Sequence, residues 1–178
     1  MYLLLQAFAV VGIPPGRWPD SFSYEQLSLT GADVRLPTVP LLYKIFPTDS
    51  LRVWAQVLLA TVAWWVLAST AAALIRDRRV RIGLRAVLLG LGLASAIAGW
   101  NSTILSESTA ISLTALLIAA LIGFRERLDL TAAALLVLAL LFWTFVRQPH
   151  VLMCALIAVA FVAAVLRTGG QKRAVCAL

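Results

Sequence analysis

Long apolar stretches separated by short polar breaks make up most of the chain. Five of these stretches cover residues 51–75, 86–100, 104–124, 130–146 and 151–166. As a helix, the first would reach about 37 Å, at about 1.5 Å per residue, and so cross a hydrocarbon core of roughly 30 Å. The pattern therefore predicts five complete membrane spans, all of them α-helical.

The shorter stretches are expected to pair as two helical hairpins. The first hairpin turns near residues 99–102, and the second at residues 147–150, where Pro149 has no N–H group with which to continue a helix. A sixth apolar stretch, residues 1–13, would reach only about 20 Å as a helix. We expect it to be a partial first span. The sequence thus predicts an all-α polytopic bundle that forms a single transmembrane domain over residues 1–178.

The composition agrees with a membrane protein. Of the 178 residues, 62% are hydrophobic, whereas soluble domains are roughly 45–50% apolar. The net charge of +7 arises from arginines in short loops, which is typical of the cytoplasmic side of a membrane protein and not of a nucleic-acid interface. The two cysteines are not spaced for a metal site or a disulfide. We expect the lipid bilayer, and no nucleic acid, as a partner.

Lys and Arg residues are concentrated on one side of the predicted bundle. They cluster in residues 76–85, in residues 125–129 and in the tail, residues 167–178. The positive-inside rule places these segments in the cytoplasm, which leaves the long polar loop 14–50 outside. With the Ala-, Leu- and Arg-rich composition, this pattern indicates a multi-pass protein of a bacterial cell membrane.

The outer loop 14–50 holds four of the eight acidic residues of the chain. One of them, Asp20, lies in a Pro-Asp-Ser sequence just after the first apolar stretch. One interpretation makes Asp20 the N-cap of a short interfacial helix. The other makes it a base, because a carboxylate at the membrane surface can accept a proton from a substrate hydroxyl. The two roles are compatible.

Arg35 and Lys44 delimit a second candidate unit, RLPTVPLLYK. Its two prolines are expected to fix an extended turn. As structural residues, the two cations would extend to lipid headgroups where the segment re-enters the membrane. As functional residues, they would clamp a phosphate, because Arg makes bidentate contacts with phosphate oxygens. The sequence leaves both interpretations open.

Three further polar features lie at predicted turns on the outer side. Glu107 opens a span, where an acid is either a functional group or a partner of the positive helix N-terminus. His150 is interpreted as an interfacial polar residue, because one His cannot build a metal-ligand set. Asn101-Ser102-Thr103 is a glycosylation sequon, which we expect to lie too close to the membrane to be an acceptor.

Several of these pieces follow one another in a definite order. An apolar segment precedes Asp-Ser-Phe-Ser-Tyr at residues 20–24, and Arg-Leu-Pro-Thr-Val-Pro follows at residues 35–40. One span opens with Leu-Arg-Val-Trp-Ala-Gln at residue 51, and a later one with Ile-Leu-Ser-Glu-Ser at residues 104–108. Over roughly residues 5–150, this order resembles the amino-terminal half of GT-C-type membrane glycosyltransferases, which use sugars linked to a polyprenyl phosphate.

The resemblance implies roles for four residues. Asp20 matches the first-loop acid, which acts as base on the acceptor or helps to hold a metal, and Glu107 matches the acid of the later box. Arg35 matches the arginine of the proline box, a contact for the lipid phosphate, and Lys44 is a looser match. No cofactor is implied with certainty, and participation of a divalent metal is left open. The implied reaction transfers a sugar from a polyprenyl-phosphate-linked donor at the outer face of the membrane.

Members of that class are usually longer and carry more spans. We therefore expect the chain to be their amino-terminal module or a reduced relative, incomplete or inactive alone. The alternative is a non-enzymatic membrane scaffold or accessory subunit. In that case small residues of this chain would pack against helices of a partner membrane protein. These residues include Gly90, Gly92, Ala94 and Ala98. A transporter is disfavoured, because no charge lies in the middle of a predicted span.

Overall fold

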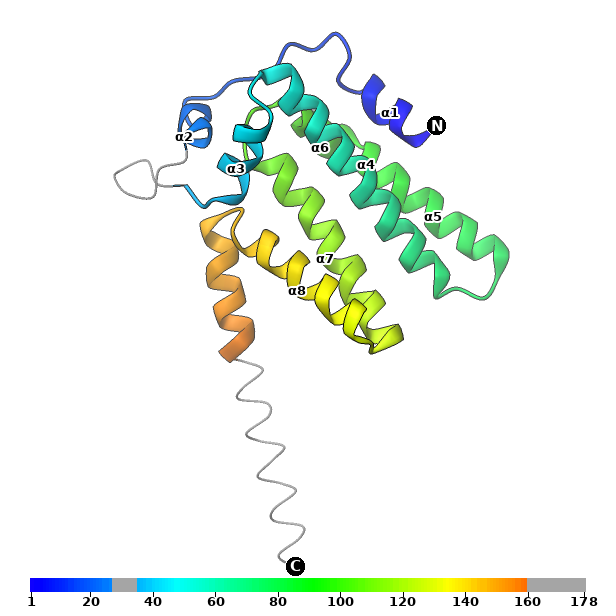
Figure 1. The fold of residues 1–178 in the computed structure, drawn as a ribbon. Helices are drawn as coiled ribbons and strands as arrows, with labels where there is room; N and C mark the ends of the chain where they lie inside the picture. Colours follow the sequence, from blue (N-terminus) through cyan, green and yellow to red (C-terminus); the bar gives the residue numbers. More distant parts are fainter. Residues whose placement is uncertain (27–34, 160–178) are drawn as a thin grey trace, which may run out of the picture.

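The computed structural model describes residues 1–26 and 35–159, whose regular elements are all helices (Figure 1). The longer helices are α4 (Asp49–Ala73), α5 (Arg78–Leu93), α7 (Glu107–Arg127) and α8 (Leu130–Thr144). The shorter ones are α1 (Tyr2–Phe8), α2 (Ser21–Glu25), α3 (Thr38–Ile45), α6 (Ser95–Ala98) and the 3₁₀-helix η1 (Gly99–Ser102). A last described helix, Gln148–Val159, follows α8. The prediction of an all-α protein is confirmed.

Two helices, α4 and α7, are long and apolar enough to cross a membrane. Helix α5 joins the segment Ser95–Ser102 at a bend of 49°, and this bent pair would count as a third span. Helix α8 and the helix Gln148–Val159 are apolar but shorter. The end of the last predicted span and the predicted cytoplasmic tail, residues 160–178, lie outside the described residues.

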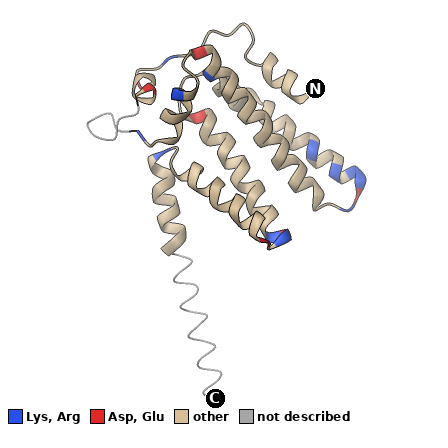
Figure 2. Cartoon of the chain, in the orientation of Figure 1, with Lys and Arg blue, Asp and Glu red and all other residues tan. Residues whose placement is uncertain are grey.

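Charged residues gather toward the two ends of the bundle, and the middles of α4, α7 and α8 carry none (Figure 2). Helix α4 has no Asp, Glu, Lys or Arg after Arg52, and α7 has none between Glu107 and Arg125. We call the end that contains residues 14–26, residues 35–48 and the starts of α4 and α7 the loop end. The opposite end, with the α4–α5 and α7–α8 connections, is the arginine end. This separation fits helices whose middle faces hydrocarbon.

Small side chains allow the central helices to approach closely. Helix α4 packs against α5 on one side and α7 on the other, and Ala63, Ala68 and Ala72 are fully buried. Gly92 of α5 is the tightest contact, because a Cβ there would lie 2.6 Å from Cγ of Trp64 and 2.5 Å from the Tyr2 hydroxyl. Gly92 therefore serves packing within the chain and not, as the scaffold interpretation expected, against a partner.

Two expectations about proline are wrong. The proline box does not form an extended turn, because Pro40 lies in the first turn of α3. Pro149 does not break a hairpin, because it lies in the first turn of the helix Gln148–Val159, and the break falls at residues 145–147. The physical reason is the same in both cases. N–H groups in the first helical turn have no intrahelical acceptor, so proline costs nothing there.

A buried polar network attaches α1 to the rest of the bundle. The Gln6 amide donates to the Tyr2 hydroxyl and to the carbonyl of Gly92, both at 2.9 Å. The Asn101 amide donates to Oε1 of Gln6 at 3.2 Å, and the hydroxyl of Ser108 donates to Oδ1 of Asn101 at 2.6 Å. The network joins α1, α5, η1 and α7, so the short first helix is held by hydrogen bonds as well as by packing.

Candidate functional site

The first part of the outer loop is fastened to the segment that precedes α7. The backbone of Gly16 accepts from the N–H of Ile104 at 2.9 Å and donates to the carbonyl of Ser102 at 2.8 Å. In α2, the Ser21 hydroxyl donates to the carbonyl of Ile104 at 2.8 Å, and the hydroxyls of Tyr24 and Ser106 lie 3.1 Å apart. Helix α2 and the start of α7 therefore form one unit at the loop end.

Helix α3 is anchored through Tyr43, which is 1% exposed. Its hydroxyl donates to the carbonyl of Leu105 at 3.0 Å and accepts from the Gln56 amide at 2.8 Å. Burial raises the pKa of the Tyr43 phenol far above its usual value, because the charged phenolate would be desolvated. At the other end of α3, the backbone N–H of Thr38 donates to the carbonyl of Phe145. These contacts fix the loop on α4, on α7 and on the end of α8.

The side chains of Asp20 and Arg35 contact each other at the loop end. Nη2 of Arg35 lies 3.4 Å from Oδ1 of Asp20, while Nε of Arg35 donates to the Ser23 hydroxyl at 2.8 Å. The guanidinium lies over the ring of Tyr24, 4.9 Å from its centroid. The Asp20 side chain is 67% exposed. The carboxylate is thus open to solvent, whereas the arginine is held by three neighbours.

Asp20 occupies the N-cap position of α2, but its side chain makes no capping hydrogen bond. The helix begins where the sequence predicted, and the carboxylate instead faces Arg35. The two side chains line a small pocket of about 190 Å³ with Ser23, Gln26, Pro19 and Phe22. We call it the Asp20–Arg35 pocket. Its volume suits one small polar group and not a whole lipid-linked sugar, which would extend beyond it.

Glu107 lies in the first turn of α7, as predicted. Its Oε1 pairs with Nη2 of Arg147 at 3.1 Å, and its Oε2 is buried without a hydrogen-bond partner among the described residues. Glu107 directly follows Ser106, which contacts Tyr24. The structure therefore places Glu107 at the same end as the Asp20–Arg35 pocket, although it does not line that pocket.

Lys44 stands apart from these residues. It is exposed in the last turn of α3, outside the lining of the Asp20–Arg35 pocket. His150 stacks on Trp143 with ring centroids 4.1 Å apart, and its Nδ1 lies 2.8 Å from the Trp143 carbonyl. These contacts hold His150 against the end of α8.

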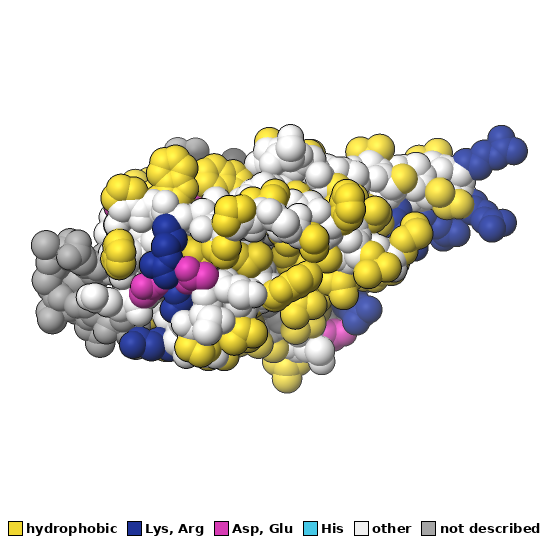
Figure 3. Space-filling model, turned by 90° about the horizontal axis from the view of Figure 1, so that it is seen from above, with side chains coloured by type: hydrophobic (Ala, Val, Ile, Leu, Met, Phe, Trp, Pro, Cys, Tyr) yellow, Lys and Arg dark blue, Asp and Glu magenta, His cyan; other side chains and the backbone are white. Residues whose placement is uncertain are grey.

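An ion-pair network that the sequence analysis passed over also lies at the loop end. Arg17 contacts Asp49 at 2.7 Å and Glu25 at 2.8 Å, and Arg52 contacts the same two carboxylates. Arg52 is 8% exposed and lies over the ring of Tyr43. The hydrogen bond to Asp49 raises the pKa of Arg17. Figure 3 shows basic and acidic side chains side by side in one compact patch of this surface.

The carboxylates at the loop end do not converge on one point. In residues 1–26 and 35–159, no three His, Cys, Asp or Glu side chains are grouped as metal ligands. Asp20 is the one carboxylate among the residues that line the Asp20–Arg35 pocket. A Mg²⁺ ion held by one or two carboxylates and by substrate phosphates would fit such a donor set better than a cage built from protein alone.

No protein-family model, no curated protein sequence and no solved structure matches the chain.

Proposed function

We propose that the chain is a GT-C-like membrane glycosyltransferase, or its amino-terminal module, which transfers a sugar from a polyprenyl-phosphate-linked donor to an acceptor. The observation that supports this proposal most directly is the pairing of Asp20 with Arg35. An exposed carboxylate lies 3.4 Å from a guanidinium at one end of a bundle of apolar helices. A proton acceptor and a phosphate-binding cation are the two groups that this chemistry requires at the membrane surface.

The proposal includes a topology. The loop end faces the outside of a bacterial cell membrane, and the arginine end faces the cytoplasm, in accord with the positive-inside rule. Helices α4 and α7 span the bilayer, as do the bent α5 pair, α8 and the helix from Gln148, while residues 1–13 supply a partial span. The donor's lipid tail stays in the bilayer, so its phosphate lies at headgroup level, where the loop end would be.

Asp20 and Arg35 act on different bonds in the proposed reaction. The acceptor oxygen forms a bond to the anomeric carbon of the sugar, and the bond between that carbon and the phosphate oxygen breaks. Asp20 takes the acceptor's proton, and Arg35 stabilises the charge that develops on the phosphate. The distance of 3.4 Å between them is longer than a strong ion pair, so Arg35 can turn toward a phosphate and keep its bond to Ser23.

Glu107 and Lys44 have supporting roles in this proposal. Glu107 is held by Arg147 at the start of α7, beside the segment that docks α2. Lys44 is exposed and adds attraction for an anionic headgroup without a fixed contact. We expect changes at these residues to affect donor binding or folding more than the chemical step.

The test is sugar transfer by the full chain reconstituted in lipid vesicles with polyprenyl-phosphate-linked sugars as donors. Asp20→Asn should lower the rate by about 10²-fold or more, because loss of a general base typically costs that much. Arg35→Ala should act in the same direction. Glu126→Gln and Arg125→Ala, at the arginine end, are the matched controls and should retain the rate. Transfer that survives both loop-end changes would rule out this site.

The alternative function is a non-enzymatic scaffold or accessory subunit. Gly92 is the one residue of α5 that is buried, so most of this helix is free to contact lipid or another helix. If no donor supports transfer, and a complex isolated with the tagged chain dissociates when α5 is altered, the scaffold function replaces the enzymatic one. Leu91→Trp, at an exposed position of α5, is a suitable change.

A further inference from the structure

A second, larger cavity lies between α4, α7 and α8, and its lining runs from Leu113 and Phe142 to the arginine end. It has a volume of about 710 Å³, within the range of roughly 300–1,000 Å³ that small ligands occupy. Its walls are mostly apolar and come from all three helices, for example Val66, Leu113, Leu116, Leu135, Leu138 and Phe142. It extends to the arginine end, where Leu74, Glu126 and Arg127 line it. We call it the apolar groove.

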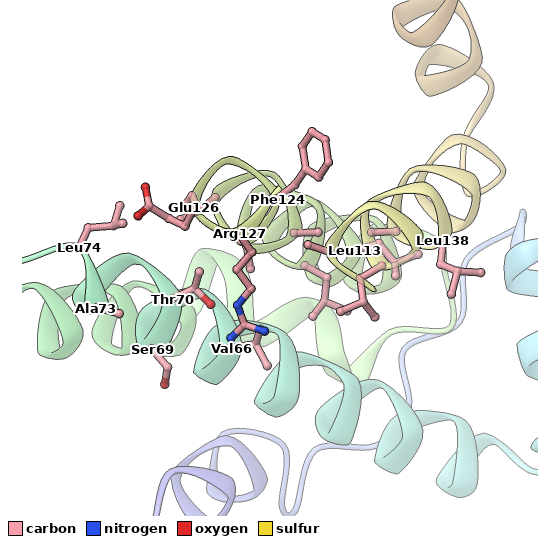
Figure 4. Close-up of a pocket in the computed structure, with 18 of the residues that line it drawn as sticks. Val66, Ser69, Thr70, Ala73, Leu74, Leu113, Phe124, Glu126, Arg127 and Leu138 are labelled. Atoms are coloured by element: carbon pink, nitrogen blue, oxygen red, sulfur yellow. The ribbon is translucent and has the colours of Figure 1, made fainter. Parts of the chain in front are cut away.

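The mouth of the apolar groove is polar. Arg127 extends from α7 across the groove toward α4, so that its guanidinium lies near Val66 and Thr70 (Figure 4). Ser69 and Thr70 of α4 line the same region. Glu126, the one acid in the lining, points away from Arg127 toward Leu74 (Figure 4). The groove therefore combines long apolar walls with one inward-pointing cation and two hydroxyls.

Arg127 lacks a carboxylate partner within the described part of the chain, although six other ion-pair contacts are present there. Arg127 is exposed, so its guanidinium is free to contact an anion that enters the groove mouth. The nearest arginines of the sequence, Arg125 and the group from Arg76 to Arg85, add to the positive potential of this end. An anion is thus the complementary ligand at the groove mouth.

We propose that the apolar groove binds one anionic phospholipid from the leaflet at the arginine end. An acyl chain lies between α4, α7 and α8, and the phosphate contacts Arg127, with the hydroxyls of Ser69 and Thr70 as further donors. Bidentate contact of Arg with phosphate is the favoured geometry for such a pair. The site does not depend on the proposed glycosyl transfer, because it shares no lining residue with the Asp20–Arg35 pocket and its polar mouth lies at the arginine end.

The dimensions favour a lipid chain over a helix of another protein. A helix with its side chains is about 10 Å wide, and at that width a volume of 710 Å³ would be filled by about two turns. A hydrocarbon chain is much thinner and can follow the groove along α7. The Arg127 guanidinium favours an anionic over a zwitterionic phospholipid, because the ammonium group of a zwitterionic headgroup repels the guanidinium.

Native mass spectrometry of the detergent-purified full chain tests the proposal. The probes are phosphatidylglycerol and phosphatidylcholine with identical acyl chains, added in equal amounts. We expect phosphatidylglycerol to be retained preferentially. Arg127→Gln should lower that preference by about tenfold, which corresponds to about 1.4 kcal/mol, whereas Arg125→Gln, at a residue outside the groove lining, should retain it.

A second pair of variants tests the apolar part of the site. Gly123 lines the groove and has no atom within 4 Å of the position of a Cβ, so Gly123→Leu should fill the groove without distorting α7. It should reduce the retention of both lipids. Gly90→Leu is the control, because Gly90 is equally open but lies on α5, outside the groove.

Four results would overturn the proposal. One is equal retention of the two lipids, and another is equal behaviour of the Arg127 and Arg125 variants. The third is displacement of phosphatidylglycerol by an equimolar polyprenyl phosphate, which would assign the groove to the donor lipid instead. A Gly123→Leu protein that keeps its lipid would place the bound lipid elsewhere on the surface and would likewise reject the groove.

Discussion

The hydroxyl groups of Tyr24 and Ser106 lie 3.1 Å apart, although 82 positions separate the two residues in the sequence. This buried contact joins α2, in the loop after the first apolar stretch, to the residue that precedes α7. Arg35 stacks on the same tyrosine ring. The contact therefore positions the Asp20–Arg35 pocket relative to the start of α7, so its loss should disturb the pocket as well as the fold.

Removal of either hydroxyl should destabilise the protein. Tyr24→Phe and Ser106→Ala should each lower the free energy of unfolding by about 1 kcal/mol or more, because the remaining partner is buried and unsatisfied. The double variant should cost less than the sum of the two single changes. Titration with a denaturing detergent, followed by circular dichroism, measures these values. Strict additivity would show that the two hydroxyls do not interact.

Gly92 and Gly90 provide a matched pair on α5. Gly92→Ala should destabilise the protein by about 1–3 kcal/mol, since its Cβ would lie 2.5–2.7 Å from Tyr2 and Trp64. Gly90→Ala meets no atom within 4 Å and should stabilise the helix by up to about 1 kcal/mol. The midpoints of thermal unfolding should move in opposite directions. The packing of α5 on α4 would need revision if both variants shifted the midpoint in the same direction.

The two arginines of the loop-end ion-pair network should differ sharply in their contribution to stability. Arg52 is 8% exposed and Arg17 is 40% exposed. Arg52→Met should cost about 1–3 kcal/mol, because the Phe46 carbonyl loses the guanidinium that donates to it, although Arg17 still pairs with both carboxylates. Arg17→Met should cost about 1 kcal/mol or less, and its effect should shrink at high salt. Unfolding of both variants at low and high salt tests this ranking, which equal losses would contradict.

Tyr43 should make stability depend on alkaline pH. Burial raises the pKa of its phenol above the usual value of 10.0, so above about pH 10 the unfolded state loses this proton and the folded state retains it. The stabilisation is complete below the unfolded pKa and is lost as the pH rises toward the folded pKa. Wild-type stability should therefore fall above about pH 10, and Tyr43→Phe should show a shallower decline from a lower starting value.

Thermal unfolding between pH 8 and pH 11 in one detergent measures this effect on a scale of about 1 kcal/mol per unit of pH. Tyr24→Phe is the reference, because it removes a different phenol at the same end of the bundle. A Tyr43→Phe slope identical to that of the wild type would assign the alkaline loss to other groups.

The long apolar helices were predictable because long uncharged stretches are a strong sequence signal for membrane-spanning helices. Helices α4 and α7 were both expected, although α7 begins at Glu107 and not at residue 104. The earlier start was wrong because the carbonyls of Ile104 and Leu105 accept from the hydroxyls of Ser21 and Tyr43 and not from helical N–H groups, contacts that no local pattern encodes. The predictions for the proline box and for Pro149 were wrong because a proline is tolerated in the first turn of a helix as readily as it ends one.

The residues of the candidate site were proposed from the sequence one by one, and their arrangement was not. Asp20 and Arg35 were selected separately, and no local pattern indicates that they face each other. Lys44, chosen with Arg35, lies outside the pocket. Arg52 was missed, although its spacing of three residues from Asp49 at a helix start was a usable signal. Its second carboxylate, on Glu25, comes from a distant segment and could not be anticipated.

The buried network around Gln6 gives the sequon at Asn101 an unexpected meaning. A glycan would be attached to the side-chain nitrogen of Asn101, which already donates a hydrogen bond to Gln6. Asn101 is only 3% exposed. An oligosaccharide transferred to this nitrogen would have to arrive before α1 docks, and it would then keep α1 from docking. In a host that glycosylates asparagine, modification at this position would thus occur only on chains in which α1 docks more slowly than the glycan is transferred.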